Sequence, residues 1–485
     1  MTTISASNAN EERIDVPSSN RRWLTRACAT AAIALAGCST LPVITPDMAN
    51  VDPSNVKLQA ANGHILSPDR SREIIARLSN GSGSDVLSRH LALEQQIADS
   101  PLVLGNRVTL LQDGPNTYAT MFRLIDSARD SINMETYILD DDEVGRRLAD
   151  ALIAKQAAGV QVNLIHDAVG TLGTSKEYFQ RLRDAGIAVV TFNPVNPLAA
   201  KAGWQVNNRD HRKLLVVDGT SAVLGGINIS SVYSSSPGGG STGGSSIGSR
   251  GDKKEALPWR DTDLLVEGPV VAELQKLFFE TWTAQKGPGP APRRYFPSLE
   301  KRGPAVVRAI GSAPDDPFSQ IYVTLISAIN SAEGEILITN AYFVPDPQLV
   351  QALIGAARRG VDVKLIVPST TDSSLVFHAG RSHYETLLEG GVKLYERRAA
   401  LLHAKTAVID GVWSTVGSTN LDWRSFLHNQ ELTAVILGTD FGTKMRAAFE
   451  SDLAVSDQVT LEAWRKRPLT TRMKEQFARL WEYWL

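Results

Sequence analysis

Two stretches of the sequence follow one template and decide the fold. Residues 211–228 read HRKLLVVDGTSAVLGGIN, and residues 403–420 read HAKTAVIDGVWSTVGSTN. Each copy has His, one residue, Lys, four residues, Asp, six residues, Gly, then Gly or Ser, one residue, and Asn. Two matched copies with five polar positions each argue against coincidence. They predict a chain built from two copies of one unit.

The template predicts a strand, a turn and a second strand. His and Lys, two positions apart in an extended segment, place both side chains on one face. The apolar runs 214–217 and 407–409 are typical of strands buried on both faces, and the Asp-Gly pairs at 218–219 and 410–411 predict turns. The second strand leads to the Gly pair, where glycine lets backbone approach a ligand closely. Each copy therefore presents an imidazole, an ammonium and an amide at one rim.

Strands and helices alternate on either side of these motifs. The patterns predict strands at 107–111, 131–139, 160–166 and 187–192, and helices at 118–129, 144–158 and 176–185. The order recurs later: the Ala-Leu-Ile of 151–153 returns at 352–354, and the Gly-Val of 159–160 returns at 360–361. We therefore predict an α/β fold with two similar lobes, each a mostly parallel sheet with helices on both faces.

The segment before the first lobe has the features of an export signal. Three arginines (Arg21, Arg22 and Arg26) precede an apolar run at 27–35, which is too short to span a bilayer. Leu35-Ala36-Gly37-Cys38 resembles a bacterial lipobox, which implies lipidation of Cys38, and Ser39 resembles the outer-membrane sorting pattern. We expect a lipoprotein of the bacterial cell envelope, on the periplasmic side and held at the outer membrane through Cys38.

These features divide the chain into five parts. We predict a lipoprotein signal peptide at 1–37, a spacer with a short helix at 38–90, and a first lobe at 91–286. A Pro- and Gly-rich linker follows at 287–303, and a second lobe at 304–485.

The two motifs resemble the HxKxxxxD motif of the phospholipase D superfamily, and the likeness covers about 380 residues from near Arg107 onward. Within the superfamily, the stretches 207–213, 259–261 and 135–138 resemble bacterial cardiolipin synthases, which exchange a phosphatidyl group between two phosphatidylglycerols. The resemblance implies an active site at a pseudo-twofold axis between the lobes.

Each lobe offers one further carboxylate for this site. Asp261 lies seven residues before Gly268, as Glu431 does before Gly438, so the two are counterparts, although Asp263 competes with Asp261. The resemblance implies that Glu431 orients His211, the nucleophile, and that Asp261 orients His403, the general acid and base. It also implies that Lys213, Lys405, Asn228 and Asn420 hold the phosphate and that Asp218 and Asp410 tie the motif loops.

This set of residues can perform phosphoryl transfer without a cofactor. One neutral imidazole attacks phosphorus, the other gives a proton to the leaving alcohol, and lysines and asparagines bind the anionic oxygens. We expect no metal. The substrate is then a phospholipid, with phosphatidylglycerol preferred, and the reaction is phosphatidyl transfer through a phosphohistidine.

Two other functions stay open from the sequence. The first is a phospholipase D-type phosphodiesterase that hydrolyses lipid. Nucleic acid is disfavoured as its substrate, because removal of 1–37 leaves 46 Lys and Arg against 49 Asp and Glu, a net charge of −3. The second is a catalytically silent surface lipoprotein that serves as a scaffold, against which both complete motifs argue.

Overall fold

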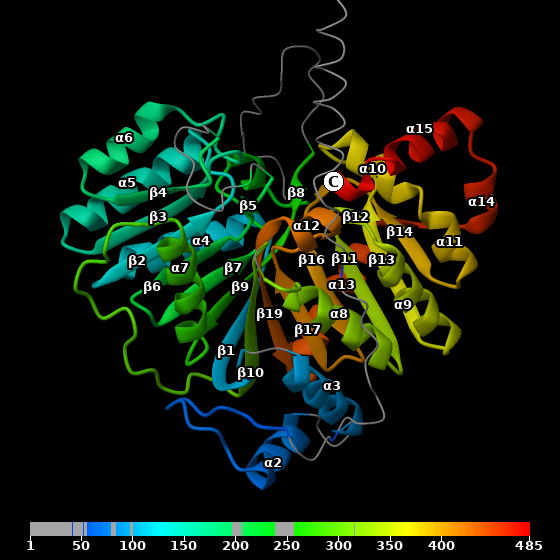
Figure 1. Cartoon of the computed structure of the whole chain (residues 1–485), viewed down its shortest axis with the longest axis horizontal. Helices are drawn as coiled ribbons and strands as arrows, with labels where there is room; N and C mark the ends of the chain where they lie inside the picture. Colours follow the sequence, from blue (N-terminus) through cyan, green and yellow to red (C-terminus); the bar gives the residue numbers. More distant parts are fainter. Residues whose placement is uncertain are drawn as a thin grey trace, which may run out of the picture. The chain divides into compact units, whose positions relative to one another are not determined.

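The computed structural model describes residues 41, 52, 56–78, 84–97, 100–195, 205, 207–237, 257–314 and 316–485 (Figure 1). The predicted signal peptide and Cys38 lie outside the described residues. Both lobes belong to one unit, Pro42–Leu485.

The first lobe alternates strands and helices as predicted, then ends in short strands. Its elements are β1 (Val103–Gln112), α4 (Asp113–Ser127), β2 (Ser131–Thr136), α5 (Glu143–Ala157), β3 (Gln161–Asp167), α6 (Lys176–Asp184), β4 (Ala188–Phe192), β5 (Arg209–Asp210), β6 (Leu214–Val217), β7 (Ser221–Gly225), η4 (Ser231–Tyr233), β8 (Trp259–Arg260), β9 (Thr262–Glu267) and α7 (Val271–Ala284).

The second lobe repeats this order with additions. Its elements are β10 (Ala305–Ser312), α8 (Gln320–Ser331), β11 (Glu335–Asn340), β12 (Phe343–Val344), α9 (Pro347–Arg358), β13 (Asp362–Pro368), α10 (Ser374–Arg381), α11 (Tyr384–Glu389), β14 (Lys393–Arg397), β15 (Leu401–Leu402), β16 (Lys405–Ile409), β17 (Trp413–Gly417), β18 (Leu421–Asp422), α12 (Trp423–Leu427), β19 (Asn429–Leu437), α13 (Thr439–Leu453), β20 (Ser456–Val459), α14 (Leu461–Arg465), α15 (Leu469–Arg479) and η5 (Glu482–Trp484).

The two lobes share one continuous sheet. Its order is β20-β14-β13-β11-β16-β17-β19-β10-β1-β9-β7-β6-β2-β3-β4, and the antiparallel pair β1–β10 joins the lobes. Helices cover both faces, and one apolar core runs across the junction from α7 to α13 (Figure 1). The predicted α/β class with two similar lobes is confirmed.

The strand pairing within each lobe is mixed, so the expectation of mostly parallel sheets needs correction. In the first lobe, β2, β3 and β4 are parallel, whereas β6, β7, β9 and β1 are antiparallel to their neighbours. The second lobe repeats this with β11, β13 and β14 parallel. The reason is local: the Asp-Gly turn of each motif joins its two strands directly, and a tight turn can connect only antiparallel strands.

The segment predicted as a spacer with a short helix, 38–90, packs against the rest of the chain over the residues described there. Gln59 pairs with the start of β1, and Val56 and Leu58 are fully buried. Two helices follow, α2 (Pro68–Leu78) and α3 (Ser84–Ile97), and the boundary at 90 cuts α3. Leu87 and Leu91, four residues apart on α3, are buried because this face packs on α8 of the second lobe.

The predicted linker at 287–303 joins α7 to β10 without a helix or strand, but it packs closely on the first lobe. The Trp282 indole N–H donates to the Pro288 carbonyl at 2.9 Å, and the ring of Tyr295 lies 4.8 Å from that of Phe279. No helix among the described residues is both long and apolar enough to cross a bilayer.

Candidate active site

The two motif histidines are held by short strands that cross between the lobes. β5 pairs with β19, and β8 pairs with β15. The backbone N–H of His211 donates to the carbonyl of Gln430 at 2.9 Å, and that of His403 donates to the carbonyl of Arg260 at 2.8 Å. Each histidine is therefore hydrogen-bonded to the residue just before Glu431 or Asp261, the carboxylate residue of the other lobe.

The carboxylates contact the histidines across the lobes. Nδ1 of His211 lies 3.0 Å from Oε1 of Glu431, and Nδ1 of His403 lies 2.6 Å from Oδ2 of Asp261. Both carboxylates are fully buried. Because Nδ1 is engaged in each ring, Nε2 is the nitrogen left for a substrate. Asp263, the competing candidate, instead accepts a hydrogen bond from the backbone N–H of Ile227.

Both imidazoles are poised as neutral rings. Burial lowers the pKa of His211 to about 4, although Glu431 opposes the shift. Burial, with help from Lys405, also lowers the pKa of His403 against the pull of Asp261. A neutral ring is what a nucleophile requires, whereas an acid must first gain a proton. A negatively charged phosphate bound nearby would raise both pKa values.

The lysines show that the two motifs form a single site. Nζ of Lys213 donates to the carbonyl of His211, and Nζ of Lys405 to that of His403. Burial lowers the pKa of Lys213 to about 7 and that of Lys405 in the same direction. Each ammonium also lowers the pKa of the histidine in the other motif. Four basic groups therefore share one electrostatic environment.

The two asparagines differ in how far their amides are engaged. Oδ1 of Asn228 accepts from the backbone N–H of Ile138 at 3.0 Å, and Nδ2 donates to the Tyr233 hydroxyl at 3.2 Å. Oδ1 of Asn420 is buried and has no hydrogen-bond partner among the described residues. The structure brings both to the motifs, but the Asn228 amide is held by protein groups.

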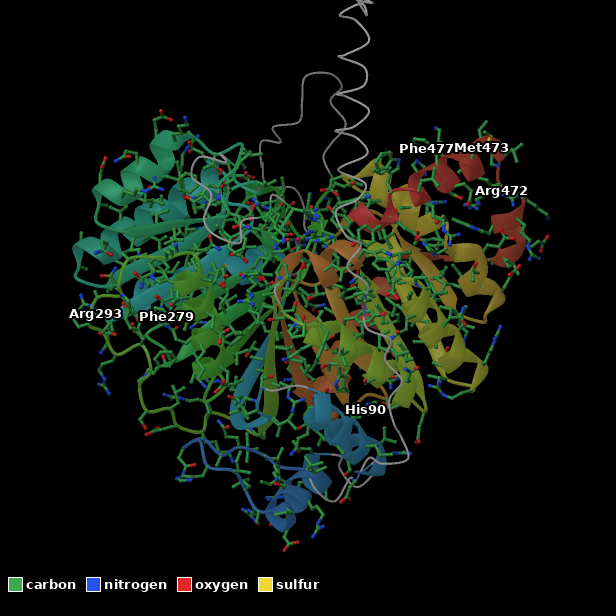
Figure 2. The ribbon with its side chains drawn as sticks, viewed as in Figure 1. His90, Phe279, Arg293, Arg472, Met473 and Phe477 are labelled. Carbon is green, nitrogen blue, oxygen red and sulfur yellow. The ribbon has the colours of Figure 1, made fainter. Side chains whose placement is uncertain are left out.

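The motif aspartates lie at the far end of the hairpins and bind backbone. Asp218 accepts from the N–H groups of 129–131 at the start of β2. Asp410 accepts from those of 333–335, and Nε2 of His90 on α3 lies 3.2 Å from its Oδ2. Figure 2 labels His90 on this helix. These carboxylates fix the hairpin to the neighbouring strand and, in the second lobe, to α3.

We expect Asp218→Ala to destabilise the fold. The change leaves three backbone donors without their acceptor, at a cost of about 1–3 kcal/mol in the free energy of unfolding. Urea unfolding measures the loss. Asp218→Asn keeps one acceptor oxygen and should lose less, so equal losses in the two variants would contradict this role.

Several aromatic groups that surround the histidines were not predicted as site residues. The ring of Tyr137 lies 5.2 Å from that of His211, and three aromatic rings lie 5.2–6.3 Å from that of His403, those of Tyr233, Trp259 and Tyr342. Tyr137 and Trp259 fall within the stretches that resemble cardiolipin synthases, and this resemblance could have marked them as site residues. These rings shield the imidazoles from water.

The Gly pair also differs from its expected use. A Cβ at Gly226 would overlap the carboxylate of Asp261, so glycine there makes room for this carboxylate rather than for a ligand. The matching Ser418 donates its hydroxyl to Oε2 of Glu431. Each pair therefore supports the carboxylate in its own lobe.

Among the described residues, His166 does not form a second centre of this kind. His166 is buried between Thr171 and Thr191, and its ring stacks on Phe179 at 4.0 Å. Within the part of the chain that the structure describes, no cluster of three or more His, Cys, Asp or Glu side chains has a metal-binding arrangement.

Comparison with known proteins decides the family. The model of the family described as "Cardiolipin synthase, PLD-like domain" matches residues 121–234 and 325–453, and the two segments contain both motifs. The chain is 36% identical over 393 residues to the cardiolipin synthase of Geobacillus sp. (strain WCH70), covering 80% of this chain and 74% of that protein. The chain belongs to the cardiolipin synthase family of phospholipase D-like proteins.

Other similarities agree with the cardiolipin synthase family. The cardiolipin synthase of Listeria monocytogenes serotype 4a (strain HCC23) is 34% identical over 382 residues, covering 78% of this chain and 75% of that protein. The crystal structure of phosphatidylserine synthase from Haemophilus influenzae Rd KW20 has a TM-score of 0.62, with 81% of this chain and 99% of that chain covered. At 13% identity, this likeness concerns the fold alone.

Proposed function

We propose that this protein is a phosphatidyltransferase that forms cardiolipin from two molecules of phosphatidylglycerol. One observation carries the proposal: two histidines with free Nε2 atoms, each bound to a carboxylate of the opposite lobe, share one site with two lysines. The kinship with cardiolipin synthases supports the choice of lipid substrate.

The first half of the reaction forms a covalent intermediate. Nε2 of His211 attacks phosphorus, the bond from phosphorus to the glycerol oxygen breaks, and the imidazolium of His403 gives its proton to that oxygen. Glycerol leaves, and the phosphatidyl group stays on His211. Lys213 and Lys405 balance the charge on the non-bridging oxygens.

The second half returns the enzyme to its starting state. Neutral His403 takes the proton from a hydroxyl of a second phosphatidylglycerol, whose oxygen attacks phosphorus and displaces Nε2 of His211. The product is cardiolipin. Water in place of the second lipid would give phosphatidic acid, and the aromatic rings around His403 disfavour that outcome by limiting access of water.

Incubation with phosphatidylglycerol, followed by mass spectrometry of the lipids, tests this function. We expect cardiolipin and glycerol in equal amounts. Phosphatidic acid as the main product would identify a hydrolase, and no product from a folded sample would favour a scaffold. The same preparation of His211→Asn is the control for contaminating activities.

The pH dependence of kcat/KM should have two limbs set by the free enzyme. Activity falls as pH drops toward 4, because protonation removes the lone pair of His211, whose pKa is about 4. Activity also falls as pH rises, because His403, whose pKa burial lowers, loses the proton that it gives to the leaving group. It falls further through about 7, where the Lys213 ammonium, with a pKa of about 7, loses its proton and its hold on phosphate. A pH series of initial rates measures both limbs. Lys213→Arg keeps the charge and should move the alkaline limb upward, whereas an unmoved limb would contradict the assignment to Lys213.

We further propose that the protein is anchored by lipid on Cys38, on the periplasmic side of the outer membrane. The basic and apolar pattern of 21–35 and the Leu-Ala-Gly-Cys sequence support this. Cys38→Ala should abolish lipid attachment and leave the precursor uncut, as measured by mass spectrometry of the intact protein. Processing of the variant to the same mature length would contradict the proposal.

A further inference from the structure

The outer face of α15 carries large apolar side chains that contact solvent. Leu469, Met473 and Phe477 recur every four residues and are 71%, 65% and 63% exposed. We call this the outer α15 surface, and it also includes Leu480, Trp481, Trp484 and, from α10, Leu375. Figure 2 shows Met473 and Phe477 at the outer edge of α15. Apolar patches of this kind on proteins mark sites of interaction.

The inner face of α15 holds the helix firmly on the second lobe. Ala478 is buried in a small core with Val344 and Ala379. The buried carboxylate of Glu475 lies 2.6 Å from the guanidinium of Arg467. A groove of ≈ 470 Å³ lies between α10 and α15, lined in part by Leu375, Met473 and Phe477. The exposed stripe is therefore a fixed face of a docked helix.

Basic side chains border this surface. Residues 461–485 contain six Lys and Arg against three Asp and Glu, a net side-chain charge of +3 in a chain whose total is −2. Arg472 and Lys474 lie on the two sides of the stripe, and neither forms an ion pair within the described residues. Trp481 and Trp484 stand at one end. Aromatic and basic groups around an apolar stripe are the composition of helices that lie in a membrane interface.

The outer α15 surface adjoins the active site. Leu375 lies three residues after Asp372, which accepts a hydrogen bond from the Tyr342 hydroxyl at 2.6 Å, and the Tyr342 ring lies 6.3 Å from that of His403. A second link runs through the last residue of the sequence. The carbonyl of Leu485 accepts a hydrogen bond from the backbone N–H of Arg424 in α12, and this helix leads into β19 and Glu431. In Figure 1, α10 and α15 lie at the upper right, α12 lies nearer the centre, and α2 and α3 lie at the bottom.

We propose that the outer α15 surface docks on a phospholipid bilayer and brings the active site to its lipid substrate. The apolar stripe enters the boundary between headgroups and acyl chains, and Arg472 and Lys474 contact anionic headgroups. A second copy of the chain fits less well, because its equivalent surface would bring the same positive charge. The proposal rests on the proposed function for its choice of a lipid surface, and it adds a contact that does not depend on Cys38.

A fluorescent label on this surface tests the docking directly. Cys28 and Cys38 are the only cysteines in the chain, so the full chain with both replaced by Ser can carry a single label at Phe477→Cys. Vesicles of phosphatidylglycerol and phosphatidylcholine should shift the emission of an environment-sensitive dye to the blue, and brominated lipids should quench it.

The matched control is Phe296→Cys. Phe296 is 53% exposed and lies beside Phe279, which Figure 2 places far from α15. Equal responses at 477 and 296 would overturn the proposal. A blue shift of the dye at 477 that appears at higher protein concentration without vesicles would also overturn it, because a second copy of the chain would then cover this surface.

A kinetic comparison separates this inference from the proposed function. Met473→Ser with Phe477→Ser removes apolar area from exposed positions, so the fold should survive. Transfer from phosphatidylglycerol in vesicles should fall by roughly tenfold or more, since burial of two large side chains is lost. Transfer from a short-chain phosphatidylglycerol dissolved as monomers should be unchanged. Full activity of the variant on vesicles would overturn the docking surface alone, whereas no transfer by the unaltered chain on either substrate would overturn the proposed function.

Discussion

His211→Asn should abolish turnover with every substrate, whereas His403→Asn should keep a measurable reaction when the leaving group needs no proton. Without His211 no covalent intermediate forms, because no other described imidazole contacts Glu431. Without His403 the transfer from phosphatidylglycerol loses its general acid, which is worth roughly 10²–10⁴-fold in rate. A phosphatidyl ester of p-nitrophenol leaves without protonation, so its release measures the first step alone.

The double variant supplies the control for this division of labour. Because the two imidazoles act in one sequence of steps, loss of both should cost no more than loss of His211. Rescue of His211→Asn by the p-nitrophenyl ester, with none for His403→Asn, would reverse the two roles.

Replacement of the two orienting carboxylates should depend on the leaving group in the same way as replacement of the two histidines. Glu431→Gln presents an amide N–H to Nδ1 of His211, favours the tautomer with the proton on Nε2, and so removes the lone pair that attacks phosphorus. We expect a loss of roughly 10²–10⁴-fold in kcat, by analogy with the wrong tautomer in other carboxylate-oriented histidines. Steady-state rates with phosphatidylglycerol and with the p-nitrophenyl ester measure it, and neither substrate should restore activity.

Asp261→Asn is the matched variant in the other lobe. It removes a group that raises the pKa of His403, so less of the protonated imidazole is present, and the p-nitrophenyl ester should recover most of the lost rate. Unfolding by urea is measured for both variants, because each removes a buried charge next to a histidine. If the p-nitrophenyl ester restored the rate equally in both variants, the two carboxylates would have the same role, which would contradict the separate roles given to His211 and His403.

The parts of the site that could be predicted are those that the sequence repeats. The duplicated motif gives both histidines and both lysines, and equal spacing to Gly268 and Gly438 points to Asp261 and Glu431. The alternation of side chains along the strand could not exclude Asp263. Asp261 and Asp263 are two apart in an extended segment, so alternation alone puts both on one face, and only the crossing of β8 to β15 brings Asp261 to His403.

The parts that could not be predicted depend on contacts between distant segments. α3 has no repeat partner, and its place is set by buried groups such as Glu94, which meets the guanidinium of Arg308 and the indole N–H of Trp413. The rings around His403 come from both lobes and share no sequence pattern. The outer α15 surface has the periodicity of an ordinary amphipathic helix, and only the folded structure, in which Glu475 and Ala478 are the buried residues, shows that the apolar stripe faces outward.

The central claim is that the phosphatidyl group passes through His211, and the position of the trapped intermediate tests it most directly. His403→Asn is mixed with the p-nitrophenyl ester and quenched in mildly alkaline denaturant, because phosphorus–nitrogen bonds to histidine are labile in acid. The protein is then digested and its peptides are analysed by mass spectrometry. We expect the phosphatidyl mass on the peptide that contains His211, and its absence when His211→Asn is combined with His403→Asn. In the unaltered chain, the same mass on the peptide that contains His403, or turnover with neither peptide labelled, would contradict this claim.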